Sequence, residues 1–195
     1  WEDMASRIRV RMSDAGWLKR KLFSWGESLG RSVVRKELNK QPVGPGIKIL
    51  RFFMNLAVYR PLLDRLGCSH FSSAFTGGHP ISPDVIGFFR AIGLNLKQCY
   101  GLTESGGIFQ IQPDDEVKLE TVGKSLHLTE VKIAEDQEVL VKSEANFSGY
   151  YNDYKATEAA FENGWLKTGD AGYIDDDGHL LIIGRKEDII RNKSG

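Results

Sequence analysis

FSSAFTGGHPISPDVIGFFRAIGLNLKQCYGLTES, residues 71–105, gives the strongest indication of the fold class. Phe71–Phe75 has the apolar composition of a buried strand. Ser82-Pro83-Asp84 then supplies an N-cap, a proline at the first helical position and an acid that the helix dipole favours. The predicted helix buries Val85, Phe89 and Ile92, and the strand Leu94–Tyr100 follows it. Strand, helix and strand in this order predict a βαβ unit, which places the chain in the α/β class.

Each of the two predicted strands is followed by a glycine-containing polar segment, Thr76-Gly77-Gly78 and Gly101-Leu102-Thr103-Glu104. Ligands of such units bind beyond the carboxyl ends of the strands. A nucleotide carried as its magnesium salt needs a hard oxygen ligand, which Glu104 offers, and a partner for phosphate oxygens, which Thr103 offers. Tyr100 adds an aromatic face for a base. The alternative is a capped turn whose polar groups form hydrogen bonds only with one another.

A second polar motif, GWLKTGD at residues 164–170, precedes a predicted strand pair that ends in Gly184-Arg185. The carboxylate of Asp170 can accept both hydroxyls of a ribose, and the guanidinium of Arg185 can hold ribose or phosphate oxygens. Taken alone, Asp170 suits a turn and Arg185 suits the surface. Together with the motif at residues 100–105 they indicate one nucleotide site.

The flanking regions differ in their predicted structure. Residues 1–40 have helical spacing of Trp17, Leu18, Leu22, Trp25 and Leu29, and a second helical run, Ile47–Leu66, is expected to pack through Phe52, Phe53, Leu56, Tyr59 and Leu63. After about residue 120 the pattern predicts short strands at 130–134, 138–142, 172–174 and 180–184, with a helix at 153–161. Asp176-Asp177-Gly178 is typical of a hairpin turn, and it lacks the closing Glu of a calcium loop.

Composition limits the class of protein. The chain of 195 residues has 41% apolar residues and a formal net charge of zero, and no apolar run approaches a membrane span. Two distant cysteines and four scattered histidines indicate neither a disulfide framework nor a zinc site, so a reducing cytoplasm is expected. Residues 1–60 contain 13 Lys and Arg against 5 Asp and Glu. This basic region predicts a solvated helical surface or peripheral contact with anionic membranes; without alternating aromatic and basic residues, nucleic acid is not expected.

The motifs resemble, in the same order, those of the adenylate-forming superfamily, and most closely long-chain fatty-acyl-CoA ligases. The resemblance rests on Trp1-Glu2, Leu18–Phe23, Thr76–Pro80, Tyr100–Ser105, Thr121–Gly123, Gly149–Tyr151, Trp165–Asp170 and Gly184–Ile190. It implies an αβα layered N-terminal domain of an acyl-CoA synthetase, seen in part, with a small β-rich subdomain of distorted-barrel type, truncated at the hinge. The implied substrates and cofactors are a fatty acid, ATP, Mg²⁺ and coenzyme A.

The same resemblance assigns roles to residues. Thr103 and Glu104 would act on phosphate and magnesium, Asp170 and Arg185 would hold the ribose, and Glu187 falls at the hinge about which a C-terminal domain swings. The residues implied to line the nucleotide and acyl-adenylate pocket are Gly77, Gly78, His79, Pro80, Tyr100, Gly101 and Ile182. The expected division is a basic helical segment (1–66), a nucleotide-binding portion (67–120), a β-rich subdomain (121–184) and a hinge (185–195).

Departures from the family pattern leave alternatives open. The sequence has no Ser/Thr/Gly-rich phosphate loop followed by Lys and no C-terminal domain with an adenylation lysine, and Lys193 lies too close to the hinge to be that residue. The isolated chain is therefore expected to be inactive, because the transition-state charge is largely unmet. His79 replaces a usual small residue, and Glu187 replaces the commoner Lys or Asp. The alternatives are a fatty-acyl-AMP ligase and a catalytically silent nucleotide-binding or membrane-contacting module.

Overall fold

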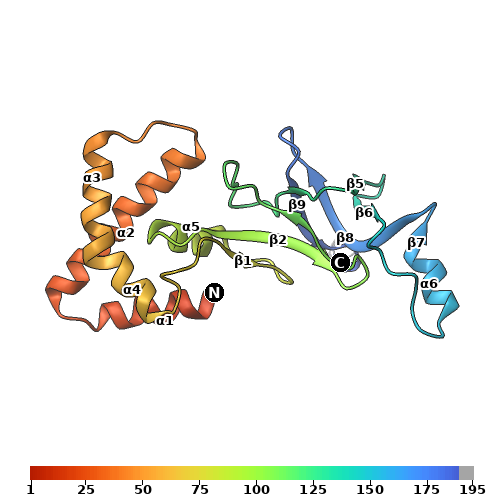
Figure 1. The fold of residues 1–195 in the computed structure, drawn as a ribbon. Helices are drawn as coiled ribbons and strands as arrows, with labels where there is room; N and C mark the ends of the chain where they lie inside the picture. The colour runs from red at the N-terminus through yellow and green to blue at the C-terminus, as the bar shows by residue number, and fades with distance from the viewer. Residues whose placement is uncertain (189–195) are drawn as a thin grey trace. The chain divides into compact units, whose positions relative to one another are not determined.

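The computed structural model describes residues 1–188, which fall into two compact units that divide between Lys97 and Gln98 (Figure 1). Helices make up most of the first unit, and strands make up most of the second. Within the described residues, no helix has both the length and the apolar character needed to cross a membrane. The unit of strands carries the second polar motif and the residues around Tyr100, so it positions most of the predicted site.

The first unit contains six helical segments and one short strand. They are α1 (Glu2–Ser13), α2 (Trp17–Leu38), α3 (Pro45–Met54), the π-helical turn η1 (Asn55–Tyr59), α4 (Arg60–Arg65), β1 (Ala74–Thr76) and α5 (Pro83–Ala91). The apolar centre lies where α2 meets α5. Gly30 of α2 permits this contact, because a Cβ there would lie 2.1 Å from the carbonyl oxygen of Ala91. Phe88 and Phe89 of α5 are fully buried.

Asp84 joins three helices of the first unit. Its carboxylate contacts Arg9 of α1 at 2.8 Å and Arg31 of α2 at 2.9 Å, while Asp84 itself lies in the first turn of α5. The hydrogen bond from Arg9 is the main reason that the pKa of Asp84 lies below its ordinary value. As predicted, the Ser82 hydroxyl caps α5 by accepting the N–H of Asp84, and Val85, Phe89 and Ile92 are buried.

The apolar spacing of α2 predicts a helix correctly, but most of the spaced residues lie outside the face that the helix buries. Trp17, Leu18, Leu22 and Trp25 are exposed, and the residues that α2 buries are Phe23, Gly26, Gly30, Val33 and Val34. Likewise Phe52, Phe53 and Leu56 are exposed, whereas Tyr59 and Leu63 pack as expected. The reason for the face that α2 buries is close packing: Gly30 allows the backbone of α2 to approach Ala91 of α5, and Gly26 makes room for Met54 and Tyr59.

The second unit is antiparallel. Strands β2 (Leu96–Leu102), β3 (Gly107–Ile111) and β4 (Lys124–Ser125) pair in that order. The other strands are β5 (Thr129–Ile133), β6 (Glu138–Ser143), β7 (Phe161–Glu162), β8 (Trp165–Ile174) and β9 (Leu180–Arg185), with helix α6 (Tyr154–Ala160) before β7. Their order is β5-β6-β8-β7, and β9 also pairs with β8. This sheet is open, so the predicted distorted barrel is not found among the described strands.

Strands β3, β4 and β7 are not predicted from the sequence, and β8 begins earlier than predicted. The Gly106-Gly107 pair at the start of β3 suggests close backbone approach but no strand. β8 begins at Trp165, so most of the GWLKTGD motif is strand rather than a lead-in to one. Its burial alternates, with Leu166, Thr168 and Asp170 turned inward. The motif therefore places the Asp170 side chain on the buried side of β8.

Candidate functional site

Asp170 lies between two donors from other strands. The phenol of Tyr100 donates a hydrogen bond of 2.6 Å to Oδ2 of Asp170, and Nε of Arg185 lies 3.2 Å from Oδ1. Asp170 is 7% exposed, whereas the Arg185 side chain is 60% exposed. The carboxylate is thus held from its buried side by a tyrosine and from its open side by an arginine.

Tyr100 owes its position to an irregularity in β2. The register of β2 against β3 shifts between Tyr100 and Gly101, and a Cβ on Gly101 would lie 2.0 Å from the carbonyl oxygen of Gly107. The Tyr100 ring meets Phe109 edge to face at 5.0 Å between centroids. Burial, with the hydrogen bond to Asp170, raises the pKa of Tyr100. The phenol therefore stays protonated and is the donor of the pair.

Arg185 is placed by the pairing of β8 with β9, in which Asp170 and Arg185 are direct partners. Its Nη1 also donates to the carbonyl oxygen of Thr168 at 3.2 Å. Gly169, between Thr168 and Asp170, has a backbone φ of +71°, and a Cβ on it would lie 3.4 Å from Nη1 of Arg185. A glycine at 169 suits both the left-handed backbone and the closeness of the guanidinium.

Glu138 supports the same stretch of β8 from β6. Its Oε1 accepts the N–H of Gly169 at 2.9 Å, and its Oε2 accepts Nζ of Lys186 at 2.8 Å. Lys186 also pairs with Asp136. These contacts, led by the one with Asp136, raise the pKa of Lys186. One nearly buried carboxylate thus ties β6 and β8 to the residue that follows β9.

Thr103 and Glu104 lie in the turn between β2 and β3, as the motif predicts. The Thr103 side chain is exposed, and Oε1 of Glu104 accepts a hydrogen bond of 2.8 Å from the phenol of Tyr150. That bond is the main cause of the raised pKa of Tyr150. No cluster of three or more His, Cys, Asp or Glu suited to a metal occurs within residues 1–188. A single carboxylate nevertheless fits Mg²⁺ that arrives on nucleotide phosphates, because such ions need only one or two protein carboxylates.

The remaining predicted residues are spread over both units. Gly77, Gly78, His79 and Pro80 form an exposed loop after β1 of the first unit. Gly101 belongs to β2, and Ile182 of β9 packs with Tyr100 on the cluster of Val122, Val139 and Leu180. Glu187 is exposed. Lys193 and residues 189–195 of the predicted hinge lie outside the described residues.

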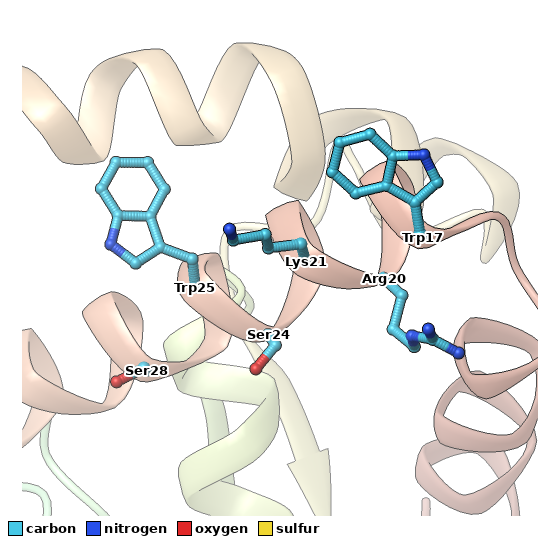
Figure 2. Close-up of a pocket in the computed structure, with 6 residues that line it drawn as sticks. All are labelled: Trp17, Arg20, Lys21, Ser24, Trp25 and Ser28. Carbon is cyan, nitrogen blue, oxygen red and sulfur yellow. The ribbon is translucent and has the colours of Figure 1, made fainter.

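The basic first third forms an open hollow of about 600 Å³ along α2. Trp17, Lys21 and Trp25 lie on one side of the helix, and Arg20, Ser24 and Ser28 lie on the other (Figure 2). The lining has two cations and no acid. The predicted membrane contact of this region remains a prediction.

Sequence reasoning did not identify Tyr150, Glu138 or Lys186 as parts of this arrangement. Tyr150 lies in Gly149-Tyr150-Tyr151, which carries the family resemblance but no assigned role. Glu138 and Lys186 look like ordinary surface charges in sequence. A charged residue directly before an apolar run, as Glu138 is before Val139-Leu140-Val141, is the one signal that could have pointed to a buried carboxylate.

Comparison with known proteins identifies the family. The family model described as AMP-binding enzyme matches residues 12–151, which is more than half of the chain. The long-chain-fatty-acid–CoA ligase FadD15 of Mycobacterium bovis is 39% identical over 154 residues, or 78% of this chain and 26% of that protein. The 2-succinylbenzoate–CoA ligase of Listeria monocytogenes is 38% identical over 144 residues, or 69% of this chain and 31% of that protein. The chain thus spans about a quarter to a third of the length of these relatives.

Solved structures agree on the fold. The o-succinylbenzoate CoA synthetase (MenE) of Bacillus subtilis, in complex with the acyl-adenylate intermediate, aligns with a TM-score of 0.60 and 32% identity over 70% of this chain and 30% of that chain. The N-terminal domain of FACL13 of Mycobacterium tuberculosis aligns with a TM-score of 0.55 and 34% identity over 63% of this chain and 34% of that chain. Sequence and fold give the same answer: the chain belongs to the family of AMP-binding enzymes, within the adenylate-forming superfamily.

Proposed function

We propose that this chain is the central part of an ATP-dependent acyl-CoA ligase that acts on long-chain fatty acids. A carboxylate attacks the α-phosphorus of ATP, a new P–O bond forms and pyrophosphate leaves. The thiol of coenzyme A then attacks the carbonyl carbon of the acyl-adenylate, and AMP leaves. The observation that supports this proposal is the Asp170 carboxylate held between Tyr100 and Arg185 in a chain of the AMP-binding family.

Within this function the residues act by binding and orientation. Asp170 accepts the ribose hydroxyls, and Arg185 adds a fixed positive charge beside the nucleotide. Thr103 bonds phosphate oxygens, and Glu104 is the protein ligand of the magnesium that ATP brings. Mg²⁺ on the phosphates lowers the cost of the charge that gathers there. In line with the sequence, we expect the isolated 195-residue chain to be inactive.

The test of this proposal is an assay of the full-length protein with palmitate, ATP and coenzyme A, following pyrophosphate, acyl-adenylate and thioester separately. Asp170→Asn should lower adenylate formation about 100-fold, because it removes a charged acceptor from the nucleotide site. Asp176→Asn, in the exposed β8–β9 turn, is the matched control and should leave the rate unchanged. Equal rates in the two variants would refute the assignment of Asp170.

The identity of the acid is a separate question, since the relatives include both long-chain-fatty-acid and 2-succinylbenzoate ligases. We expect kcat/KM for palmitate to exceed that for 2-succinylbenzoate. The reverse order would favour an aromatic acid. Release of pyrophosphate with palmitate but no thioester would favour a fatty-acyl-AMP ligase, and no adenylate with either acid would favour a silent nucleotide-binding module.

The role of Glu104 has its own measurement. Glu104→Ala should raise the Mg²⁺ concentration needed for half-maximal adenylate formation about tenfold, because it removes one charge-bearing ligand. Glu120→Ala is the control, since Glu120 is exposed on a loop of the same unit. An unchanged Mg²⁺ requirement in Glu104→Ala would show that the metal assignment is wrong.

A further inference from the structure

The protein donates one hydrogen bond to the Asp170 carboxylate, from the phenol of Tyr100 to Oδ2, and the guanidinium of Arg185 forms an ion pair with Oδ1 at 3.2 Å. An ionised carboxylate offers about four acceptor positions, two on each oxygen. At least one position on each oxygen therefore remains for a ligand. Two acceptors side by side on one carboxylate match two neighbouring hydroxyls of a sugar.

We propose that the Tyr100 hydroxyl positions the Asp170 carboxylate so that both remaining acceptors face a cis-diol, which makes the site selective for ribonucleotides over 2′-deoxyribonucleotides. This rests on the nucleotide binding in the proposed function and adds a residue that determines specificity. Tyr100 acts through Asp170, so it is a positioning residue rather than a catalytic one.

The geometry around Tyr100 explains why its hydroxyl can impose a direction. Its ring is fixed by the edge-to-face contact with Phe109, and its backbone lies at the register shift of β2. The bond to Oδ2 is short at 2.6 Å and spans 70 residues of sequence, so it depends on the folded sheet rather than on local chain geometry. Burial keeps the phenol protonated, and its O–H is therefore a constant donor.

Arg185 cannot fix the carboxylate without help. The last torsion of an aspartate is broad, so a carboxylate with one donor can turn about its own axis. Arg185 is 60% exposed, and its Nε lies 3.2 Å from Oδ1, a longer contact than the one from Tyr100. Without the phenol, the Asp170 carboxylate could pair with Arg185 in several orientations. Only some of these orientations point two free acceptor positions toward a diol.

The experiment compares AMP with 2′-deoxy-AMP by calorimetric titration of the full-length protein, and it adds KM and kcat for ATP and 2′-deoxy-ATP in adenylate formation. Tyr100→Phe keeps the ring and removes only the hydroxyl. We expect the preference for AMP over 2′-deoxy-AMP to fall about tenfold, as loss of one hydrogen bond to a charged group predicts. KM for ATP should rise by a similar factor, while kcat changes less than about twofold.

The matched control is Tyr173→Phe, the same change at an exposed tyrosine of β8. Its nucleotide preference should equal that of the wild type. In an Asp170→Asn background, Tyr100→Phe should have no further effect on the preference, because the group through which it acts is already altered. Should Tyr100→Phe fail to fold by circular dichroism, Tyr100→Met provides the decisive measurement, since it also removes the hydroxyl and must lower the preference in the same way.

Two results would overturn this inference. One is a folded Tyr100→Phe protein that binds AMP and 2′-deoxy-AMP with the wild-type ratio. The other is a wild-type protein that does not distinguish the two nucleotides or binds neither. Failure of the proposed function looks different: the wild-type protein would bind AMP with ribose selectivity lost in Tyr100→Phe, yet form no adenylate with any acid.

Discussion

Two tyrosine–carboxylate pairs in the second unit have the same chemistry in different surroundings. Tyr100 donates to Asp170 at 2.6 Å, and Tyr150 donates to Glu104 at 2.8 Å. Asp170 is 7% exposed, whereas Tyr150 is 42% exposed. Water can replace the partner of Glu104 but has little access to Asp170, so the buried pair fixes a geometry and the exposed pair can exchange partners. Under the proposed function, the difference would suit a rigid sugar contact at Asp170 and an adaptable metal or phosphate contact at Glu104.

The largest effect should come from the backbone that supports the buried pair. Gly101→Ala would place a Cβ 2.0 Å from the carbonyl oxygen of Gly107, so β2 and β3 must separate and Tyr100 must move. We expect the free energy of unfolding to fall by about 3 kcal/mol or more, measured by urea denaturation. Gly46→Ala in α3, where a Cβ meets nothing within 4 Å, is the control and should be neutral or slightly stabilising. An equal loss of unfolding free energy in the two variants would mean that the register shift at Gly101 does not support the Tyr100–Asp170 contact.

Removal of the buried hydroxyl should have the next largest effect. Tyr100→Phe leaves the buried Asp170 carboxylate with only its ion pair to Arg185, and we expect a loss of about 2 kcal/mol in the free energy of unfolding. Urea denaturation of both single variants and of Tyr100→Phe with Asp170→Asn measures the coupling between the two residues. A coupling near zero would show that the short contact contributes nothing to stability.

A buried histidine extends the comparison to pH. His179 is fully buried, its Nδ1 lies 3.0 Å from the Thr121 hydroxyl, and its Nε2 has no partner within the described chain. Burial holds its pKa below the ordinary value of 6.5, so the unfolded chain takes up a proton at a pH where the folded chain does not. Stability is therefore full above pH 6.5 and is lost as the pH falls below it, by at most about 1.4 kcal/mol per pH unit.

Urea denaturation between about pH 7.5 and pH 5.5 measures this dependence. His179→Gln should weaken the pH dependence of stability, and His127→Gln, at an exposed position, should leave that dependence unchanged. The charged groups that act on His179 are Lys118, Asp175, Lys124 and Glu116. A stability that is flat with pH in the wild-type protein would contradict the prediction.

The smallest effect should come from the exposed pair. Tyr150→Phe removes a hydroxyl whose partner, Glu104, can bond water instead, and the free energy of unfolding should change by less than about 0.5 kcal/mol. The measurement is the same urea denaturation as for Tyr100→Phe. A loss as large as that of Tyr100→Phe would break the contrast between the two pairs.

Local signals account for what the sequence predicts well. The start of α5 follows from a serine cap, a proline and an acid in consecutive positions, and its buried face follows from helical spacing. The face that α2 buries could not be predicted, because it depends on the fit of Gly30 against Ala91 of another helix. β3 was missed for a related reason: its glycine-rich start has loop propensity, and only pairing with β2 makes it a strand.

The candidate site shows the same limit. Motif chemistry selected Tyr100, Asp170 and Arg185 as parts of one nucleotide site, and in the structure Asp170 contacts both of the others. The contact between Tyr100 and Asp170 could not be derived from sequence, because nothing local relates residues 70 positions apart. The aromatic face of Tyr100 was the expected contribution, whereas its hydroxyl makes the contact that the structure shows.

The bridge from Glu138 to Gly169 and Lys186 bears on strand slippage. Strands in a hairpin can slide by two residues without turning any side chain to the opposite face, so alternation alone does not forbid such a slip. In the β8–β9 hairpin, a slip would carry Arg185 away from Asp170 and would also pull Lys186 off Glu138. The Glu138 carboxylate on β6 thus helps to fix the register of β8 against β9. It keeps Asp170 opposite Arg185 whether or not a ligand lies beside them.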